Sequence, residues 1–172
     1  MRASVPSAKL EQREDSMSVQ PVPEGYHTLI PYLAVDDAAG AIEFYKAAFG
    51  AKERARMDGP DGKVGHAELE IGDSVVMLAD PFPHASTTPP SDAGATTASI
   101  VMYIEDVDAV VRKAADAGAT ITEEVEDKFW GDRFGTIKDP FGHIWSIGTH
   151  VEDVPPHEMA ERAKSAMTAM SG

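Results

Sequence analysis

Residues 32–51 read YLAVDDAAGAIEFYKAAFGA, and residues 101–120 read VMYIEDVDAVVRKAADAGAT. Both stretches begin with a short apolar run and continue with a pair of adjacent acidic residues, Asp36-Asp37 and Glu105-Asp106. Apolar residues at helical spacing then follow, up to a glycine. An acidic side chain suits a helix N-cap, and glycine suits the position just past a helix end. The sequence therefore predicts the same strand–helix unit twice, with helices that end near Gly50 and Gly118.

Strand-like runs follow each of these helices. They are KERARM, VGHAELEI and SVVMLAD in the first copy (residues 52–57, 64–71 and 74–80), and ATITEEV, WGDRFGTI and HIWSIG in the second (residues 119–125, roughly 130–137, and 143–148). Turn-forming Gly, Pro and Asp residues separate the runs. Because order, caps and final turn recur at a nearly constant offset, we predict an α+β fold of paired βαβββ modules.

The chain divides into a central domain and two tails. Residues 1–21 are polar without an apolar period, and we expect a flexible tail there. The domain covers residues 22–150, with module one at 26–82, a Pro- and Ser/Thr-rich linker at 83–97 and module two at 98–150. In the tail 151–172, apolar residues on one stripe predict an amphipathic helix docked on the domain or on a second subunit.

Composition excludes several classes of partner. The 172-residue chain has 15 basic and 29 acidic side chains and a net charge of −14, which disfavours binding to nucleic acid. It has no cysteine, which excludes disulfides and thiolate chemistry. The absence of disulfides is compatible with the cytoplasm, where we expect the protein to be. No apolar stretch is long enough to span a bilayer, and we expect no membrane partner. No nucleophile elbow, phosphate loop or dinucleotide motif is present either.

Three longer motifs carry a resemblance to a known family: IPYLAVDDAAGAIEFYKAAFGA at 30–51, GPDGKVGHAELEIGDSVVMLAD at 59–80 and DKFWGDRFGTIKDPFGHIWSIGTHVEDV at 127–154. They resemble the vicinal-oxygen-chelate superfamily of glyoxalase I, bleomycin-resistance proteins and extradiol dioxygenases, and more narrowly its PhnB-like branch. The resemblance covers residues 23 to about 154. It implies two curved mixed sheets around a concave groove for a small molecule, helices on the outside, and a homodimer.

The resemblance also implies where a metal ion would be held. Superfamily enzymes place their ligands on the first and last strand of each module, and that pattern falls here on Ile30, Met77, Ser99 and Ser146. Aliphatic, thioether and hydroxyl groups are poor ligands for zinc, nickel or ferrous iron. We therefore expect no metal at these positions and no cofactor, while a divalent metal elsewhere is not excluded.

A polar ridge is expected on the strand VGHAELEI. Alternation places His66, Glu68 and Glu70 on the face away from the helix. His66 and Glu68 are the candidate catalytic pair, since a carboxylate beside an imidazole supports acid–base chemistry near neutral pH. Two alternatives stay open: the same residues could be ligands of a displaced divalent metal, or simply solvated polar residues on an open sheet.

The remaining candidates are predicted to bind a ligand. The same strand parity places apolar, aromatic and hydroxyl side chains in the groove, namely Tyr32, Met77, Ser99, Tyr103 and Ser146. Trp130 could stack on a flat ligand and Arg133 could clamp a carboxylate or phosphate. Alternatively, Trp130 packs under a loop and Arg133 pairs with Asp132. His150, at the end of the last strand, has the same parity and could line the mouth of the groove, or it could simply be a surface residue.

These observations favour a metal-independent protein that holds a small metabolite or antibiotic in the groove, as a cytoplasmic homodimer. The alternative is a lyase or isomerase that uses His66 and Glu68 as an acid–base pair or as ligands of a displaced divalent metal. The sequence leaves open whether the chain is an enzyme.

Overall fold

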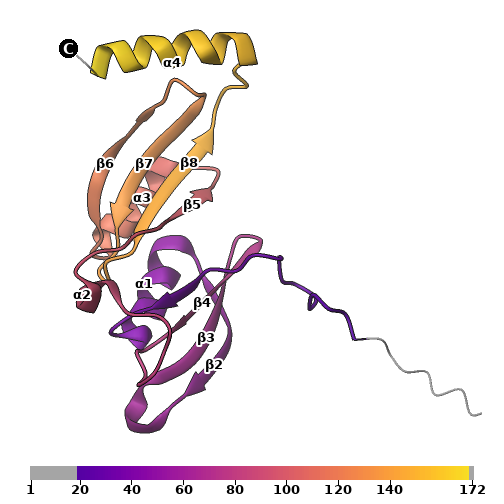
Figure 1. The fold of residues 1–172 in the computed structure, drawn as a ribbon, viewed down its shortest axis with the longest axis vertical. Coiled ribbons are helices and arrows are strands. Elements are labelled where there is room, and N and C mark those ends of the chain that lie inside the picture. The colour runs from indigo at the N-terminus through magenta and orange to yellow at the C-terminus, as the bar shows by residue number, and fades with distance from the viewer. Residues whose placement is uncertain (1–18, 171–172) are drawn as a thin grey trace, which may run out of the picture.

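The computed structural model describes residues 19–170, and Figure 1 shows two βαβββ modules arranged along the long axis, with a helix across the far end. The tail predicted at residues 1–21 lies, up to residue 18, outside the described residues. Module one consists of β1 (Tyr32–Ala34), α1 (Ala38–Phe49), β2 (Lys52–Asp58), a 3-10 turn at Pro60–Gly62, β3 (Val64–Ile71) and β4 (Ser74–Ala79). Module two consists of β5 (Ser99–Tyr103), α3 (Val107–Asp116), β6 (Thr120–Asp127), β7 (Asp132–Lys138) and β8 (Ile144–His150).

Each module forms its own four-stranded mixed sheet. The strand orders are β1-β4-β3-β2 and β5-β8-β7-β6. The first strand of each module runs parallel to the last one, and the other neighbours are antiparallel. The two sheets are separate and do not close into a barrel, which confirms the predicted α+β fold of paired modules.

The predicted caps begin and end the two module helices. Asp37 accepts a hydrogen bond from the backbone N–H of Gly40 at 2.9 Å, and Asp106 accepts one from Ala109 at the same distance. Gly50 ends α1 in the left-handed conformation with φ of 68°. The second helix stops one residue earlier than its glycine suggests, because Ala117 is its right-handed C-cap and Gly118 follows with φ of 111°.

A short helix, α2 (Pro90–Ala93), interrupts the segment predicted to be irregular. Proline is well suited to the first turn of a helix, where its missing N–H has no intrahelical partner. Pro90 is buried, and it lies so close to Gly142 that a Cβ on that glycine would come within 2.7 Å of it. The linker is therefore fastened to the turn that precedes β8.

The helix-bearing sides of both modules share one core. From α1, Tyr45 and Phe49 contact Trp145 of β8, with ring centroids 5.3 and 4.8 Å apart. α1 also packs against α3. The two modules thus bury their helix sides together, and the opposite side of each sheet, here called its helix-free face, is left partly uncovered in a single chain.

A buried carboxylate joins the modules within this core. Asp139 is 2% exposed and accepts hydrogen bonds from the Tyr45 hydroxyl at 2.7 Å and from the Trp145 indole N–H at 2.9 Å. Its other oxygen accepts from the backbone N–H groups of Phe141 and His143. Since Tyr45 belongs to module one, this network fixes the turn before β8 and the contact between modules together.

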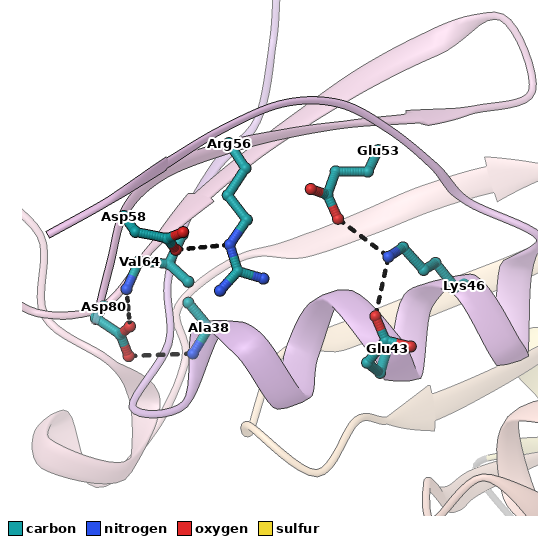
Figure 2. A network of polar contacts seen from close by, with 8 residues as sticks. All are labelled: Ala38, Glu43, Lys46, Glu53, Arg56, Asp58, Val64 and Asp80. Carbon is teal, nitrogen blue, oxygen red and sulfur yellow. Dashed lines mark hydrogen bonds and ion pairs between the residues drawn. The ribbon is translucent and has the colours of Figure 1, made fainter. Parts of the chain in front are cut away.

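Asp80 anchors the start of α1 in a similar way (Figure 2). Its carboxylate accepts from the backbone N–H groups of Ala38 at 3.1 Å and Val64 at 2.7 Å. Both donors would otherwise be buried without a partner, which costs about 1–3 kcal/mol each. Figure 2 also shows surface ion pairs along α1 and β2, formed by Lys46 with Glu43 and Glu53 and by Arg56 with Asp58.

The predicted C-terminal helix is α4 (Pro156–Met170). Arg162 fastens it to the end of module two through both carboxylate oxygens of Glu152, at 2.7 and 2.6 Å, and it also pairs with Glu158 within the helix. The side chain of Met170, part of the predicted stripe, lies outside the described residues. Among residues 19–170, no helix combines the length and apolarity needed to cross a bilayer.

Candidate functional site

The predicted His66–Glu68 pair lies on the helix-free face of module one. His66 Nε2 is 3.4 Å from Glu68 Oε1, and the other ring nitrogen of His66 lies 3.1 Å from the Tyr32 hydroxyl. Alternation along β3 puts the two side chains next to each other, as predicted from their i, i+2 spacing. Tyr32, His66 and Glu68 thus form a continuous polar chain across β1 and β3.

A residue missed by the sequence analysis extends this chain. The Tyr26 hydroxyl donates a hydrogen bond to Glu68 Oε2, and the Arg54 guanidinium lies 4.6 Å from the centre of the Tyr26 ring. The bond from Tyr26, followed by the contact with His66, lowers the pKa of Glu68. A carboxylate with a lowered pKa is a weak base, so Glu68 is suited to orient its neighbours rather than to remove a proton.

The residues present do not fit the metal site of the superfamily. Met77 and Ser146 lie beside Tyr32 and Val101 in the middle of the two sheets, Ser99 is exposed, and Ile30 precedes β1. Within residues 19–170 no group of three or more His, Cys, Asp or Glu side chains is arranged to hold an ion. A thioether and two hydroxyls are not the donor set of a zinc or iron site.

Module two has a second polar cluster, centred on Asp132. This carboxylate is 4% exposed and accepts hydrogen bonds from the Tyr103 hydroxyl (2.7 Å), the Trp130 indole N–H (2.8 Å) and His150 Nδ1 (2.8 Å). Burial alone would raise the pKa of Asp132, but the bonds from His150, Tyr103 and Trp130 outweigh it and lower the pKa. Asp132 is therefore an ionised group that orients three side chains.

His150, predicted to lie either at the mouth of the groove or simply at the surface, has two carboxylate partners in the structure. Beside its bond to Asp132, its Nε2 lies 3.0 Å from Asp153 Oδ1. The hydrogen bond with Asp132, and after it the one with Asp153, raises the pKa of His150. The sequence offers one indication of this contact. In a hairpin whose turn is closed by Lys138 and Ile144, the residues six positions further from the turn on each strand are Asp132 and His150, and they lie opposite each other.

Aromatic rings gather on the same face. Trp130 makes an edge contact with Phe134, with centroids 5.8 Å apart and planes at 76°. Gly148 makes room for this packing, because a Cβ there would lie 2.7 Å from Phe134 Cδ2 and 3.4 Å from Tyr103 Cε1. Tyr103 is 60% exposed, so the cluster presents an aromatic surface rather than a filled core. Trp130, predicted either to stack on a ligand or to pack under a loop, is half-buried here.

Arg133 lies on the other side of the sheet. Its guanidinium donates two hydrogen bonds to Asp108 of α3, at 2.6 and 2.7 Å, and one to Asp127. The predicted pairing of Arg133 with Asp132 is wrong, because neighbours on a strand point to opposite faces. Arg133 is thus on the helix side, away from the other candidates.

The structure brings the remaining candidates together in two groups, one on each module. The two helix-free faces do not cover each other in a single chain, since Tyr32, Val101 and Tyr103 are 45%, 58% and 60% exposed. Between the modules lies a cavity of about 600 Å³, lined mainly by apolar residues. Within residues 19–170, β1 pairs only with β4 and β5 only with β8, so each of these two strands has an unpaired edge, as β2 and β6 do at the other end of each sheet.

Known proteins share both sequence and fold with this chain. It is 43% identical over 152 residues to the uncharacterized protein Rv0887c of Mycobacterium tuberculosis, which covers 87% of each chain. It is 27% identical over 118 residues to protein YjdN of Escherichia coli, covering 63% of this chain and 78% of that one.

Solved structures show the same architecture. TioX from Micromonospora sp. ML1 is similar with a TM-score of 0.58 and 28% identity, covering 72% of this chain and 98% of TioX. The genomically encoded fosfomycin resistance protein FosX of Listeria monocytogenes shares the fold, with a TM-score of 0.57, 16% identity, and coverage of 77% and 96%. The family model described as Glyoxalase/Bleomycin resistance protein/Dioxygenase superfamily matches residues 26–147. This chain belongs to that superfamily.

Proposed function

We propose that this chain is a metal-independent small-molecule-binding protein of the PhnB-like branch, and that it holds an amphipathic, partly aromatic metabolite or antibiotic. The observation that carries the proposal is the pair of uncovered helix-free faces. Module one contributes the polar chain Tyr32–His66–Glu68, and module two contributes the aromatic surface around Tyr103 and Trp130. A ligand with a flat apolar part and a polar part would match both.

In this proposal the groove is completed by a second copy. Within one chain the helix sides are packed together, so the two faces point away from a common core. In a homodimer, module one of one chain can face module two of its partner, which would cover Val101 and Tyr103 and the unpaired edges of β1 and β5. The fosfomycin resistance protein FosX shares the fold, so antibiotics are one class of ligand to test.

Tryptophan fluorescence tests ligand binding directly. The chain has two tryptophans, and Trp145 is 1% exposed whereas Trp130 is half-buried beside the aromatic surface. Titration with aromatic acids, phosphonates, bleomycin and fosfomycin should change the emission of the wild type but not of Trp130→Phe. If no compound alters the emission, or if Trp130→Phe responds as the wild type does, the proposed site is wrong.

Light scattering with a charge variant tests the second copy. Val101→Lys places an ammonium on the exposed part of β5, where folding of the single chain tolerates it. We expect the wild type to be a dimer and the variant to be a monomer that has lost ligand binding. Asp116→Asn, which changes the charge by the same amount on the exposed side of α3, is the control and should stay dimeric. A monomeric wild type that binds ligand would contradict the dimeric groove.

The alternative function, a lyase or isomerase, draws support from one observation. His66 contacts both Glu68 and Tyr32, so a proton could be exchanged along the chain of three groups. Metal analysis of protein purified without chelator separates its two versions. A stoichiometric divalent ion that disappears in His66→Ala would favour the metalloenzyme and contradict metal-independent binding.

A further inference from the structure

The cluster around His150 carries an inference about the class of ligand. We propose that His150 is the anion-binding group of the groove, and that its Nε2–H donates a hydrogen bond to a carboxylate or phosphonate oxygen of the ligand, which takes the place that Asp153 now occupies. This assignment rests on the proposed function for the groove itself, and it adds an acidic group to the ligand that the aromatic surface would stack on.

The geometry orients His150 for this task. Its Nδ1 is 2.8 Å from the buried Asp132, which directs the opposite nitrogen, Nε2, outward. A buried carboxylate on one imidazole nitrogen fixes the ring and stabilises the charged form, in which both nitrogens donate. Asp132 is thus a positioning residue for His150.

An anion bound at His150 would lie next to the aromatic surface. Asp132 also receives the hydroxyl of Tyr103 and the indole N–H of Trp130, so the three side chains converge on one carboxylate. The side chain of His150 is 53% exposed at the end of β8. A flat ligand on Tyr103 and Trp130 would therefore bring an attached acid group to the imidazole.

Asp153 is a weak occupant of the position. Its side chain is fully exposed, and it lies after the end of β8 in a segment without helix or strand. An exposed ion pair of this kind contributes little to stability, because water screens it. A ligand oxygen can replace the Asp153 carboxylate at little cost, because the charge-assisted bond to Nε2 is kept and only the acceptor changes.

The experiment follows the imidazole resonances of the full ¹⁵N-labelled chain while small probes are added. Benzoate and phenylphosphonate carry the ring and the anion, and benzamide is the matched neutral probe. The chain has six histidines, and His150→Gln identifies the resonance of interest by its loss. His157→Gln, at an exposed position near the start of α4, is the control variant and should bind as the wild type does.

We expect both anions, and not benzamide, to shift the Nε2 resonance of His150. Asp153→Asn should strengthen benzoate binding by up to about fivefold, because the competing carboxylate is removed. His150→Gln should weaken benzoate binding about tenfold, because the charge-assisted hydrogen bond from Nε2 is lost. Asp153→Asn alters only an exposed side chain, so its result does not depend on whether His150→Gln folds.

The outcomes separate this inference from the proposed function. If Trp130 fluorescence responds equally to benzoate and benzamide while His150 is silent, the groove stands and the anion site is wrong. If benzoate binding weakens in Asp153→Asn, the anion site is likewise wrong. If no aromatic probe changes either signal, both the groove and the anion site are contradicted.

Discussion

Tyr45→Phe tests the joint between the two modules. The hydroxyl of Tyr45 is the only part removed, and it donates at 2.7 Å to Asp139, a carboxylate that is 2% exposed. The ring stays in place between Phe49 and Trp145, with which it makes stacked and tilted contacts. After the change, Asp139 Oδ2 keeps only the indole N–H of Trp145, at 2.9 Å.

The expected loss follows from the charge of the acceptor. A hydrogen bond to an ionised group contributes about 1.5–3 kcal/mol, and Tyr45 is fully buried, so water cannot replace the hydroxyl. We expect the free energy of unfolding to fall by about 2 kcal/mol. For a chain of this size the melting temperature should fall by about 4–8 °C.

Urea denaturation followed by circular dichroism measures this loss, with Tyr32→Phe as the matched control. The Tyr32 hydroxyl contacts His66 on the helix-free face, where the residue is 45% exposed, so its removal should change the free energy of unfolding by no more than about 0.5 kcal/mol. Equal effects of the two substitutions would refute the argument that Asp139 joins the modules through Tyr45.

Three further predictions concern the candidate site. Gly148→Ala places a methyl 2.7 Å from the Phe134 ring, and the forced shift should lower the free energy of unfolding by about 1–3 kcal/mol in urea denaturation; no loss would mean that the ring moves freely. The pKa of His150 is raised in the folded chain, so protonated His150 stabilises the fold. The difference in the free energy of unfolding between wild type and His150→Gln should be largest below about pH 6.5 and disappear as pH rises through the folded pKa. A difference that grows with pH would contradict the assigned hydrogen bonds. Tyr26→Phe removes the main cause of the lowered pKa of Glu68, so a carboxyl ¹³C titration should show that pKa rising toward its ordinary value, and an unchanged pKa would contradict the Tyr26 contact.

The fold was predictable because the repeat encodes it locally. Apolar spacing, the acidic caps at Asp37 and Asp106 and the turn glycines fix each unit within about twenty residues. The way the modules pack was not predictable, since it depends on Tyr45 reaching Asp139 across 94 positions of sequence. The helix α2 was missed for a related reason: its prolines indicate a loop unless the burial of Pro90 is known.

The candidate site was directly predictable where its residues share one strand. His66 and Glu68 are two positions apart on β3, and alternation alone makes them neighbours. Asp132 and His150 are on different strands, so their contact depends on the register of β7 and β8. Tyr26 precedes the first strand and follows no period, and no sequence signal places it on Glu68.

The two modules support the start of their helix in the same way, whereas their helix-free faces differ. In module one Asp80 accepts from the first helical N–H at Ala38, and in module two, at the same offset of sequence, Thr149 accepts from Val107 at 3.0 Å.

On the helix-free faces the equivalent positions differ in chemistry. In module one Glu68 lies opposite Met77 in the sheet, and at the equivalent position of module two Thr136 lies opposite Ser146. Two residues earlier on the same strands, module one has His66 and module two has Phe134. In the proposed homodimer, where module one of each chain faces module two of its partner, each polar face would lie against an aromatic one and both grooves would be amphipathic. Two identical faces would give a groove with the same chemistry on both sides. The difference between the faces of the two modules therefore supports the proposed binding of a molecule with one polar and one aromatic end.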